Sequence, residues 1–440
     1  MSTGLMAGII IAVLGVIVPR RQLVLLLVVT ACFVPVDQRI VVAGVDLPVL
    51  RIVTLVFMLR LLAMGQVERV RWTQFEAWLG AWAVCSTVIY VVQWGSFQAF
   101  QWKCGFLLDT IGLYWLFRQC IRSWDDLRFV VKVLAVCALV SAPLIAIEWV
   151  TGRNPFALIG TVVPQVRQGR LRCQGAFQHP GICGLFWATL APVFLTAWLG
   201  QGRRSLFIAA LVGGTFMVVA SASSSPLLSL AAGLGVVALY RYRTYTGRAW
   251  AGLAALLTIL HFSMEAPVWH LLARMNVVGG STGWFRYQVI ENAIKHFNEW
   301  ALLGCRSTEH WGWMGWDIIN QFVLEGVRGG LISMLLFIAV VVTAFRTVGR
   351  HVRRSRTRSV TLLCWGMYAS LIGHLAGFFG VNYYGQMTML WYLTLAIVGL
   401  FSEQQAVAAV ARPRRTVRAA ASHSPGLQGA AASPAQLVLG

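Results

Sequence analysis

The sequence predicts an all-α fold, a polytopic transmembrane helical bundle of about 12–13 helices with a large external loop that contains an amphipathic helix. The chain has 440 residues, of which 58% are hydrophobic and 12% charged, whereas soluble domains are usually about 25% charged. Its mean hydropathy is +0.70. Apolar runs of this kind satisfy their backbone polar groups inside a bilayer only as helices, so the composition leaves no room for a large soluble domain.

About thirteen apolar segments follow one another along the chain and are expected to be helices. The first two are short, so a count of twelve stays open. The segments are residues 5–18, 22–35, 48–64, 76–93, 104–118, 128–150, 180–199, 205–221, 226–240, 248–263, 319–345, 360–379 and 385–402.

The formal net charge of +21 comes mostly from short basic clusters between the apolar segments. The clusters fall in alternate connections, which the positive-inside rule assigns to the cytoplasm. Their placement therefore indicates topology, and we expect no nucleic-acid partner. The opposite, external side then receives loops 151–179 and 264–318.

We expect residues 1–402 to be the transmembrane domain, and residues 403–440, rich in Ala, Arg, Ser and Pro, to be a disordered cytoplasmic tail.

The first external loop carries arginines and no acid. Arg153, Arg167, Arg170 and Arg172 lie within it, against the positive-inside rule, so we expect that a phosphate or pyrophosphate ligand retains them. Contact with anionic lipid headgroups is the alternative. His179 follows before Pro180 and is a candidate either for catalysis or for capping the next helix.

The second external loop contains an amphipathic helix, predicted over residues 284–298. Arg286 lies on its apolar face with Ile290, Ala293 and Phe297, while Glu291 and Lys295 form an i,i+4 pair on another face. An arginine on an apolar face either reaches a lipid headgroup or enters a polar cavity.

Tryptophans and titratable residues crowd the end of this loop. Trp311, Trp313 and Trp316 fit an interfacial aromatic belt or a stacking surface for sugar rings. His310 and Asp317 lie beside them and are candidate proton acceptors.

The helix after the loop is expected to present one polar stripe. Asp317, Asn320, Leu324 and Arg328 fall on one side at the 3.6-residue period, so Arg328 is a candidate phosphate ligand and Asn320 a sugar contact.

The cysteines show no CxxC pair and no Cys/His cluster at metal spacing, so we expect neither a metal site nor a cofactor.

Four segments resemble the O-antigen ligase and O-antigen polymerase superfamily of bacterial envelope enzymes, in a likeness covering roughly residues 40–402. QGAFQHPGICGLFWATLAPVF resembles the family's entry into a helix, and SASSSPLLSLAAGLG resembles its serine-rich turn, without the usual arginine. GWFRYQVIENAIKHFNEWALLGC and WDIINQFVLEGVRGGLISMLLF resemble the segments around its large external loop. The histidine that many ligases carry before a GxxG is absent, since Gly315 and Trp316 stand at the matching positions.

The resemblance implies a multi-pass protein of the bacterial inner membrane whose active site faces the periplasm. It implies an inverting, metal-independent glycosyl transfer from an oligosaccharide on undecaprenyl diphosphate to an acceptor glycan or lipid A core. The missing ligase histidine favours a polymerase or ligase-like protein of an exopolysaccharide system. Arg170, Arg172 and Arg286 are expected to hold the diphosphate, and Asp317 or His310 to deprotonate the acceptor. A transporter or flippase for the same lipid-linked oligosaccharide is the alternative.

Overall fold

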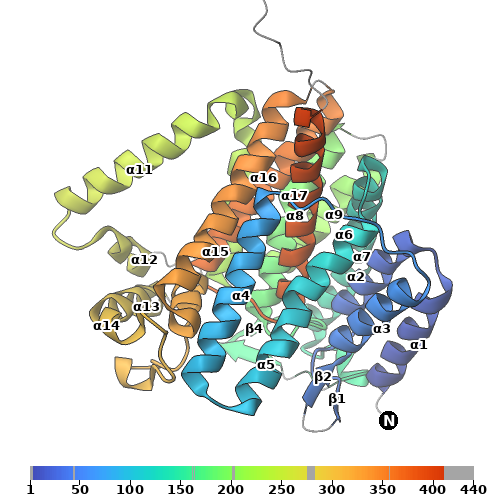
Figure 1. The fold of residues 1–440 in the computed structure, drawn as a ribbon, viewed down its shortest axis with the longest axis horizontal. Helices are drawn as coiled ribbons and strands as arrows, with labels where there is room; N and C mark the ends of the chain where they lie inside the picture. Colours follow the sequence, from blue (N-terminus) through green and yellow to red (C-terminus); the bar gives the residue numbers. More distant parts are fainter. Residues whose placement is uncertain are drawn as a thin grey trace, which may run out of the picture.

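The computed structural model describes residues 3–42, 45–160, 162, 164–200, 204–274, 283–355 and 357–410. It is an all-α bundle with two short hairpins (Figure 1). Its elements are α1 (Thr3–Ile17), η1 (Arg20–Gln22), α2 (Leu23–Phe33), β1 (Arg39–Val42), β2 (Val45–Pro48), α3 (Val49–Ala63), α4 (Gln74–Trp94), α5 (Phe97–Leu107), the π-helical turn η2 (Leu108–Gly112), α6 (Leu113–Cys120), α7 (Trp124–Thr151), η3 (Pro155–Leu158), β3 (Gln165–Arg167), β4 (Arg170–Arg172), α8 (Pro180–Gly200), α9 (Arg204–Ala220), α10 (Ser224–Ala238), η4 (Leu239–Tyr245), α11 (Thr246–Ser263), η5 (Val268–His270), α12 (Leu271–Arg274), α13 (Gly283–Lys295), α14 (Phe297–Trp300), η6 (Glu309–Trp311), α15 (Gln321–Arg354), α16 (Arg358–Phe378) and α17 (Gln386–Val410).

A helix stands at each of the thirteen predicted segments, which confirms the all-α class. Within the described residues, seven helices are long and apolar enough to cross a membrane, with α10, η4 and α11 counted as one of them. The others are α4, α7, α8, α15, α16 and α17, and α1 and the greater part of α9 are shorter apolar helices.

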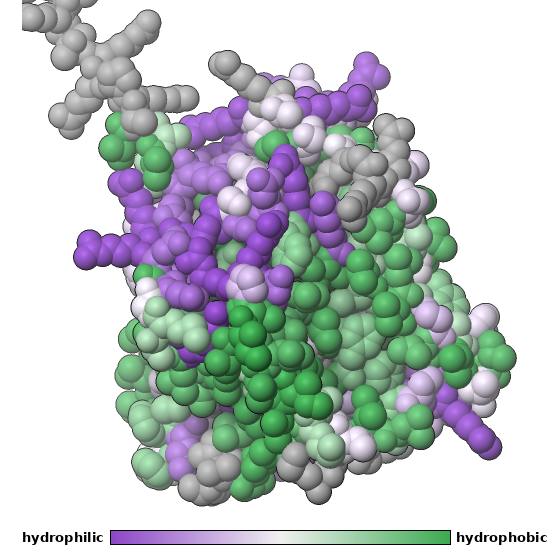
Figure 2. Space-filling view, turned by 90° about the vertical axis from the view of Figure 1, so that its right-hand side faces the viewer, coloured by the Kyte–Doolittle hydropathy of each residue, from purple (hydrophilic) through white to green (hydrophobic). Residues whose placement is uncertain are grey.

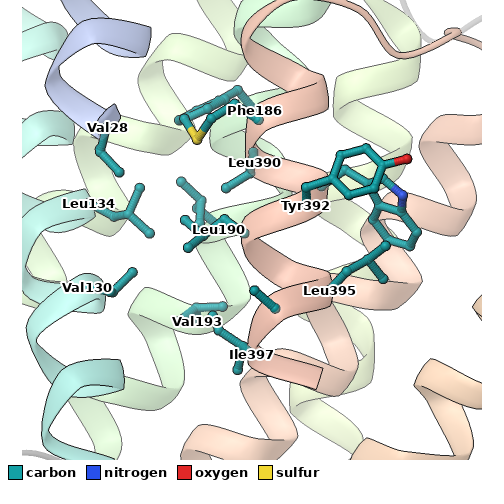
Figure 3. Packing of buried hydrophobic residues seen from close by; sticks show 14 of the residues in the cluster. Val28, Val130, Leu134, Phe186, Leu190, Val193, Leu390, Tyr392, Leu395 and Ile397 are labelled. Carbon is teal, nitrogen blue, oxygen red and sulfur yellow. The ribbon is translucent and has the colours of Figure 1, made fainter. Parts of the chain in front are cut away.

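Helix α8 lies at the centre of the bundle. Of its 21 residues, 17 are buried, because apolar side chains cover its whole circumference. Figure 3 shows Phe186, Leu190 and Val193 of α8 between Leu134 of α7 on one side and Leu390 of α17 on the other. The loop before α8 and the turns beside its first residues are thereby held against a rigid element.

The two ends of the bundle differ in charge. We call the end at which α8, α10, α15 and α17 begin the site end. The connections at the opposite end contain Arg20, Arg71, Arg122 and Arg243, and Arg353 lies there in the last turn of α15. Figure 2 shows hydrophilic residues over that opposite end, at the top of the view, above a broad apolar belt. The predicted alternation of the basic connections is therefore present in the fold.

The loops at the site end contain two hairpins that the sequence pattern did not predict. In one, β3 pairs with β4 so that Gln165 faces Arg172. Its turn, Gln168–Gly169, has positive φ at both residues, 50° and 73°, as a two-residue hairpin turn requires. After the hairpin, the Cys173 amide donates to the Ala220 carbonyl at 3.0 Å. This contact fixes Arg172 beside the turn that connects α9 to α10.

The amphipathic helix of the 264–318 segment is present as α13, followed by the short α14. The predicted Glu291–Lys295 pair forms at 3.5 Å, and Arg286 and Ala293 lie on the buried face as predicted. Phe297 was expected on that face but is 41% exposed, because α13 ends at Lys295 and the chain turns before it.

The predicted polar stripe on the following helix is wrong. Helix α15 begins at Gln321, so Asp317 and Asn320 precede it, and the Asn320 carbonyl oxygen Oδ1 caps it by accepting from the Phe322 and Val323 amides. The helix is also kinked, since Gly330 has φ of 71°. A Cβ at Gly330 would lie 2.2 Å from the Leu302 carbonyl oxygen, so glycine permits the close approach of that loop.

Helix α17 extends past the predicted boundary at residue 402. It ends at Val410, and the Glu403 carboxylate pairs with the buried Arg118 of α6 at 2.5 Å. Residues 403–410 therefore belong to the helix, because Glu403 is needed inside the bundle as a counterion. The rest of the predicted tail, residues 411–440, lies outside the described residues.

Candidate functional site

Two buried arginines are bonded to the serine run at the start of α10. Arg172 Nη2 donates to Ser223 Oγ at 2.6 Å, and Arg286 Nη2 donates to Ser225 Oγ at 2.8 Å. The Ser223 hydroxyl in turn donates to the Ser221 carbonyl at 3.0 Å. A hydroxyl that donates to a carbonyl turns its lone pairs toward the guanidinium. The serine run therefore orients arginines that come from β4 and α13.

Neither arginine has an acidic partner among the described residues. Arg172 is 9% exposed and Arg286 is 5% exposed, and no ion pair in the described part of the chain includes either one. Arg172 Nε and Arg286 Nε and Nη1 are buried without a hydrogen-bond partner. Unpaired buried charges are costly, so their retention points to an anionic ligand.

Burial lowers the pKa of both guanidinium groups, and Arg167 adds like-charge repulsion in each case. The pKa of Arg286 falls to about 10. With a pKa of about 10, Arg286 keeps its positive charge at neutral pH.

The two arginines line a cavity of about 400 Å³ at the site end. We call it the arginine cavity. It is formed by residues from the β3–β4 hairpin, the starts of α8 and α10, α13, the loop before α15 and the loop before α17. Its polar lining includes Arg167, Arg172, His179, Ser223, Ser224, Ser225, Arg286, Asp317, Asn382 and Tyr384.

Asp317 contributes the carboxylate of the arginine cavity. It lies in the loop just before α15, and no described residue forms a hydrogen bond or ion pair with its side chain. Burial raises the pKa of Asp317. The Tyr384 hydroxyl nearby has its pKa raised to about 12, first by burial and then by the Asp317 charge. The cavity thus contains a carboxylate free to accept a proton and a phenol that keeps its own.

His179 lines the same cavity but is engaged locally. Its Nδ1 accepts a hydrogen bond from the Gly181 amide at 2.9 Å, at the start of α8. Burial, Arg172 and Arg167 lower its pKa to about 4. The ring is therefore neutral with its proton on Nε2, which suits a hydrogen-bond donor better than a base.

Several predicted site residues lie outside the arginine cavity. Arg170 is exposed at the end of the hairpin turn, and Trp316 is 65% exposed. Trp311 is buried in a satellite core, and its Nε1 and His310 Nε2 both bond to Glu299. Of the three predicted tryptophans, Trp313 lines the cavity.

Arg328 lies in a second, mainly apolar cavity of about 290 Å³. Its guanidinium stacks 5.2 Å from the centre of the Trp102 ring, and an Arg51–Asp109 pair, with contacts of 3.0 and 2.5 Å, lines the same cavity. The two cavities are neighbours, since Asn382 and Tyr384 line both of them.

Sequence reasoning missed the roles of Ser223, Ser225 and Tyr384. The serine run was visible as a motif, but nothing in its spacing names the arginines that it binds. Tyr384 lies in a short loop whose sequence, VNYYG, has no charged residue to draw attention to it.

A scan against protein-family models finds no matching family, and a search of curated proteins finds no matching relative.

Proposed function

We propose that this chain is a membrane glycosyltransferase of bacterial surface polysaccharide synthesis, which transfers or polymerises glycan from an undecaprenyl-diphosphate-linked donor. One observation carries the proposal: Arg172 and Arg286 are buried, lack acidic partners among the described residues, and line one cavity with the unbonded carboxylate of Asp317.

The arginines suit a diphosphate. Guanidinium groups bind phosphate oxygens through two parallel hydrogen bonds, and the unbonded Arg172 Nε and Arg286 Nε and Nη1 supply such donors. As the bond between the anomeric carbon and the phosphate oxygen breaks, its electron pair leaves with the diphosphate. Fixed positive charges at that position stabilise the developing anion.

Asp317 is the proposed general base. The acceptor hydroxyl oxygen forms the new bond to the anomeric carbon, and its proton passes to the Asp317 carboxylate. A carboxylate whose pKa is raised by burial is a stronger base than an exposed one. One displacement of this kind inverts the anomeric configuration and needs no metal ion.

The neighbouring cavity suits the lipid part of the donor. Its lining is mainly apolar and comes from α2, α3, α5 and the loop before α17. Asn382 and Tyr384 lie at the boundary of the two cavities. We propose that the polyprenyl chain occupies the apolar cavity while the diphosphate lies in the arginine cavity, with the site end facing the periplasm.

The test is transfer by the full-length protein in proteoliposomes, with an undecaprenyl-diphosphate-linked oligosaccharide and a glycan or lipid A core acceptor. Arg286→Gln is expected to abolish transfer, whereas Arg170→Gln, on the same external surface but outside the cavity, is expected to retain it. Equal transfer by both variants would refute the proposal. In a deletion strain, shortened polymer would identify a polymerase, and unattached long polymer a ligase.

A lipid-linked oligosaccharide transporter is the second candidate, and two buried charges, one on α5 and one on the candidate membrane helix α15, favour it. Lys103 is 2% exposed and Glu325 is 7% exposed, and Glu325 accepts from Trp82 Nε1 at 2.9 Å. Such residues often mark transport paths. Movement of the labelled lipid across the liposome membrane without any joined glycan would favour this candidate.

A further inference from the structure

Two histidines and a glutamate meet on the surface of the 283–318 segment. His296 Nδ1 lies 2.7 Å from Glu299 Oε1, and His310 Nε2 lies 2.7 Å from Glu299 Oε2. One coordinating atom from each of the three residues lies within 4.8 Å of the others. Among the described residues, they are the group with this arrangement of His, Cys, Asp and Glu.

The three groups have the chemistry of a transition-metal site. Two imidazole nitrogens and one carboxylate oxygen form a common ligand set for Zn²⁺, with bonds of about 2.0–2.2 Å and water in the remaining position. In tetrahedral geometry such bonds separate neighbouring ligand atoms by roughly 3.4 Å. The two His–Glu separations of 2.7 Å are shorter than that value, and the three ligand atoms lie within 4.8 Å of one another. All three side chains are at least 30% exposed, so small rotations would complete the site.

Trp311 contacts two of the three residues and holds them in place. Its ring is stacked on His296, with centroids 5.3 Å apart and planes at 9°. Its Nε1 donates to Glu299 Oε2 at 3.0 Å, and the ring itself is buried. Hydrogen-bonded carboxylates and fixed imidazole rings are what metal sites require of their surroundings. One ligand ring and the carboxylate are therefore already oriented.

We propose that His296, Glu299 and His310 bind a divalent transition-metal ion of the Zn²⁺ class, as a clip that joins the α13–α14 junction to the loop carrying Asp317. His310 lies in η6, and Asp317 follows it in the same loop. The Asp317 amide donates a hydrogen bond to the Met314 carbonyl at 3.0 Å, so this part of the loop is compact. None of the three residues lines the arginine cavity, so the ion orders the loop and takes no part in transfer.

The sequence predicted no metal site, because its cysteines and histidines form no cluster at standard metal-ligand spacing. Here the ligands come from α14, from the residue before it and from η6. The fold closes the distance between His296 and His310.

The test uses full-length protein carrying an affinity tag without histidine, stripped with chelator in detergent. Co²⁺ binding is followed by its visible absorption, and Zn²⁺ by competition with a fluorescent chelator and by elemental analysis. We expect one ion per chain. Binding should weaken by at least roughly 10–100-fold in His310→Ala and Glu299→Gln, since loss of an outer-shell partner alone weakens metal binding by that factor. Zn²⁺ should raise the melting temperature of the unaltered protein but not that of these two variants.

His270→Ala is the matched control, since His270 lies in the same 264–318 loop, in η5, and contacts Trp284 and Tyr287 instead. It should bind the ion as the unaltered protein does. Sub-stoichiometric binding, or binding that His310→Ala and Glu299→Gln leave unchanged, would overturn the proposal. Metal content is read without any transfer assay, so this result is independent of the proposed function.

Discussion

Arg286 and Ser225 are 61 residues apart in the chain and are joined by a 2.8 Å hydrogen bond at the wall of the arginine cavity. The Ser225 hydroxyl also lies 3.5 Å from the Gly380 carbonyl. Three segments, α13, α10 and the loop before α17, thus fix one guanidinium group. The charge is placed before any ligand arrives, which is the condition for electrostatic stabilisation of a leaving group.

Ser225→Ala should therefore weaken transfer without unfolding the protein. Hydrogen bonds to a charged group contribute about 1.5–3 kcal/mol, which corresponds to a fall in transfer rate of roughly 10–100-fold. The measurement is the initial rate in proteoliposomes at saturating acceptor. Ser229→Ala is the control: its hydroxyl lies on the same helix, bonds to the Gly373 carbonyl at 2.8 Å and touches no arginine. A full rate in Ser225→Ala would show that Arg286 needs no such support.

Gly380→Ala should disable the site by displacing Arg286. A Cβ there would lie 2.5 Å from Ser225 Oγ and 2.8 Å from Arg286 Nε, closer than atoms tolerate. We expect a rate as low as that of Arg286→Gln. Gly235→Ala, on α10, is the matched control, because a Cβ there meets nothing within 4 Å. Similar rates for the two alanine variants would contradict the geometry.

The fold could be predicted from the sequence because burial in a bilayer depends on long apolar runs, which local composition reveals. Helix α8, with its continuous apolar surface, is an example. The errors occurred where a distant residue decides the outcome. The boundary at residue 402 was wrong because Glu403 pairs with Arg118, and the stripe across Asp317 and Arg328 was wrong because the Asn320 cap starts α15 late.

The candidate site was predicted in part. Arg172, Arg286, His179, Asp317 and Trp313 all line one cavity, and all five were candidates because of their residue types and their positions in the two external loops. Pairings of side chains from separate helices have no local signature. The contacts of Arg172 with Ser223 and of His310 with Glu299 therefore required the fold.

Asp317→Asn should abolish proton transfer from the acceptor hydroxyl. It should also remove the rise of the transfer rate with pH that the Asp317 carboxylate causes. A base must be ionised, so the transfer rate of the unaltered protein should rise with pH through the raised pKa of Asp317 and then level off. The variant should be slow at every pH. Glu309→Gln, an exposed carboxylate in the same loop, is the control and should keep the normal profile.

Asp317→Asn should slow transfer without lowering the stability of the protein. Because the folded-state pKa of Asp317 lies above its unfolded value, the folded state binds more protons, and this contribution to stability is lost as pH rises through the folded pKa. Asp317→Asn should therefore melt no lower than the unaltered protein at neutral pH. A clear fall in its melting temperature would mean that the carboxylate has a structural partner.

Arg286→Met should stabilise the protein while removing its affinity for anions. Replacing a buried charge that has no acidic partner among the described residues by an apolar side chain of similar length removes a desolvation cost, so the melting temperature should rise. Inorganic pyrophosphate is the probe for the anion site. A ligand present at 100 times its Kd stabilises a folded protein by about 2.7 kcal/mol, so pyrophosphate should raise the melting temperature of the unaltered protein and leave that of Arg286→Met unchanged.

Arg170→Met provides the comparison for this prediction, because Arg170 is exposed and lies outside the arginine cavity. Its melting temperature should stay close to that of the unaltered protein and should still rise with pyrophosphate. A lower melting temperature in Arg286→Met would mean that the guanidinium stabilises the fold through its bond to Ser225. Equal pyrophosphate responses in the two methionine variants would mean that the anion binds elsewhere, and the arginine cavity would then lose its role as the diphosphate site.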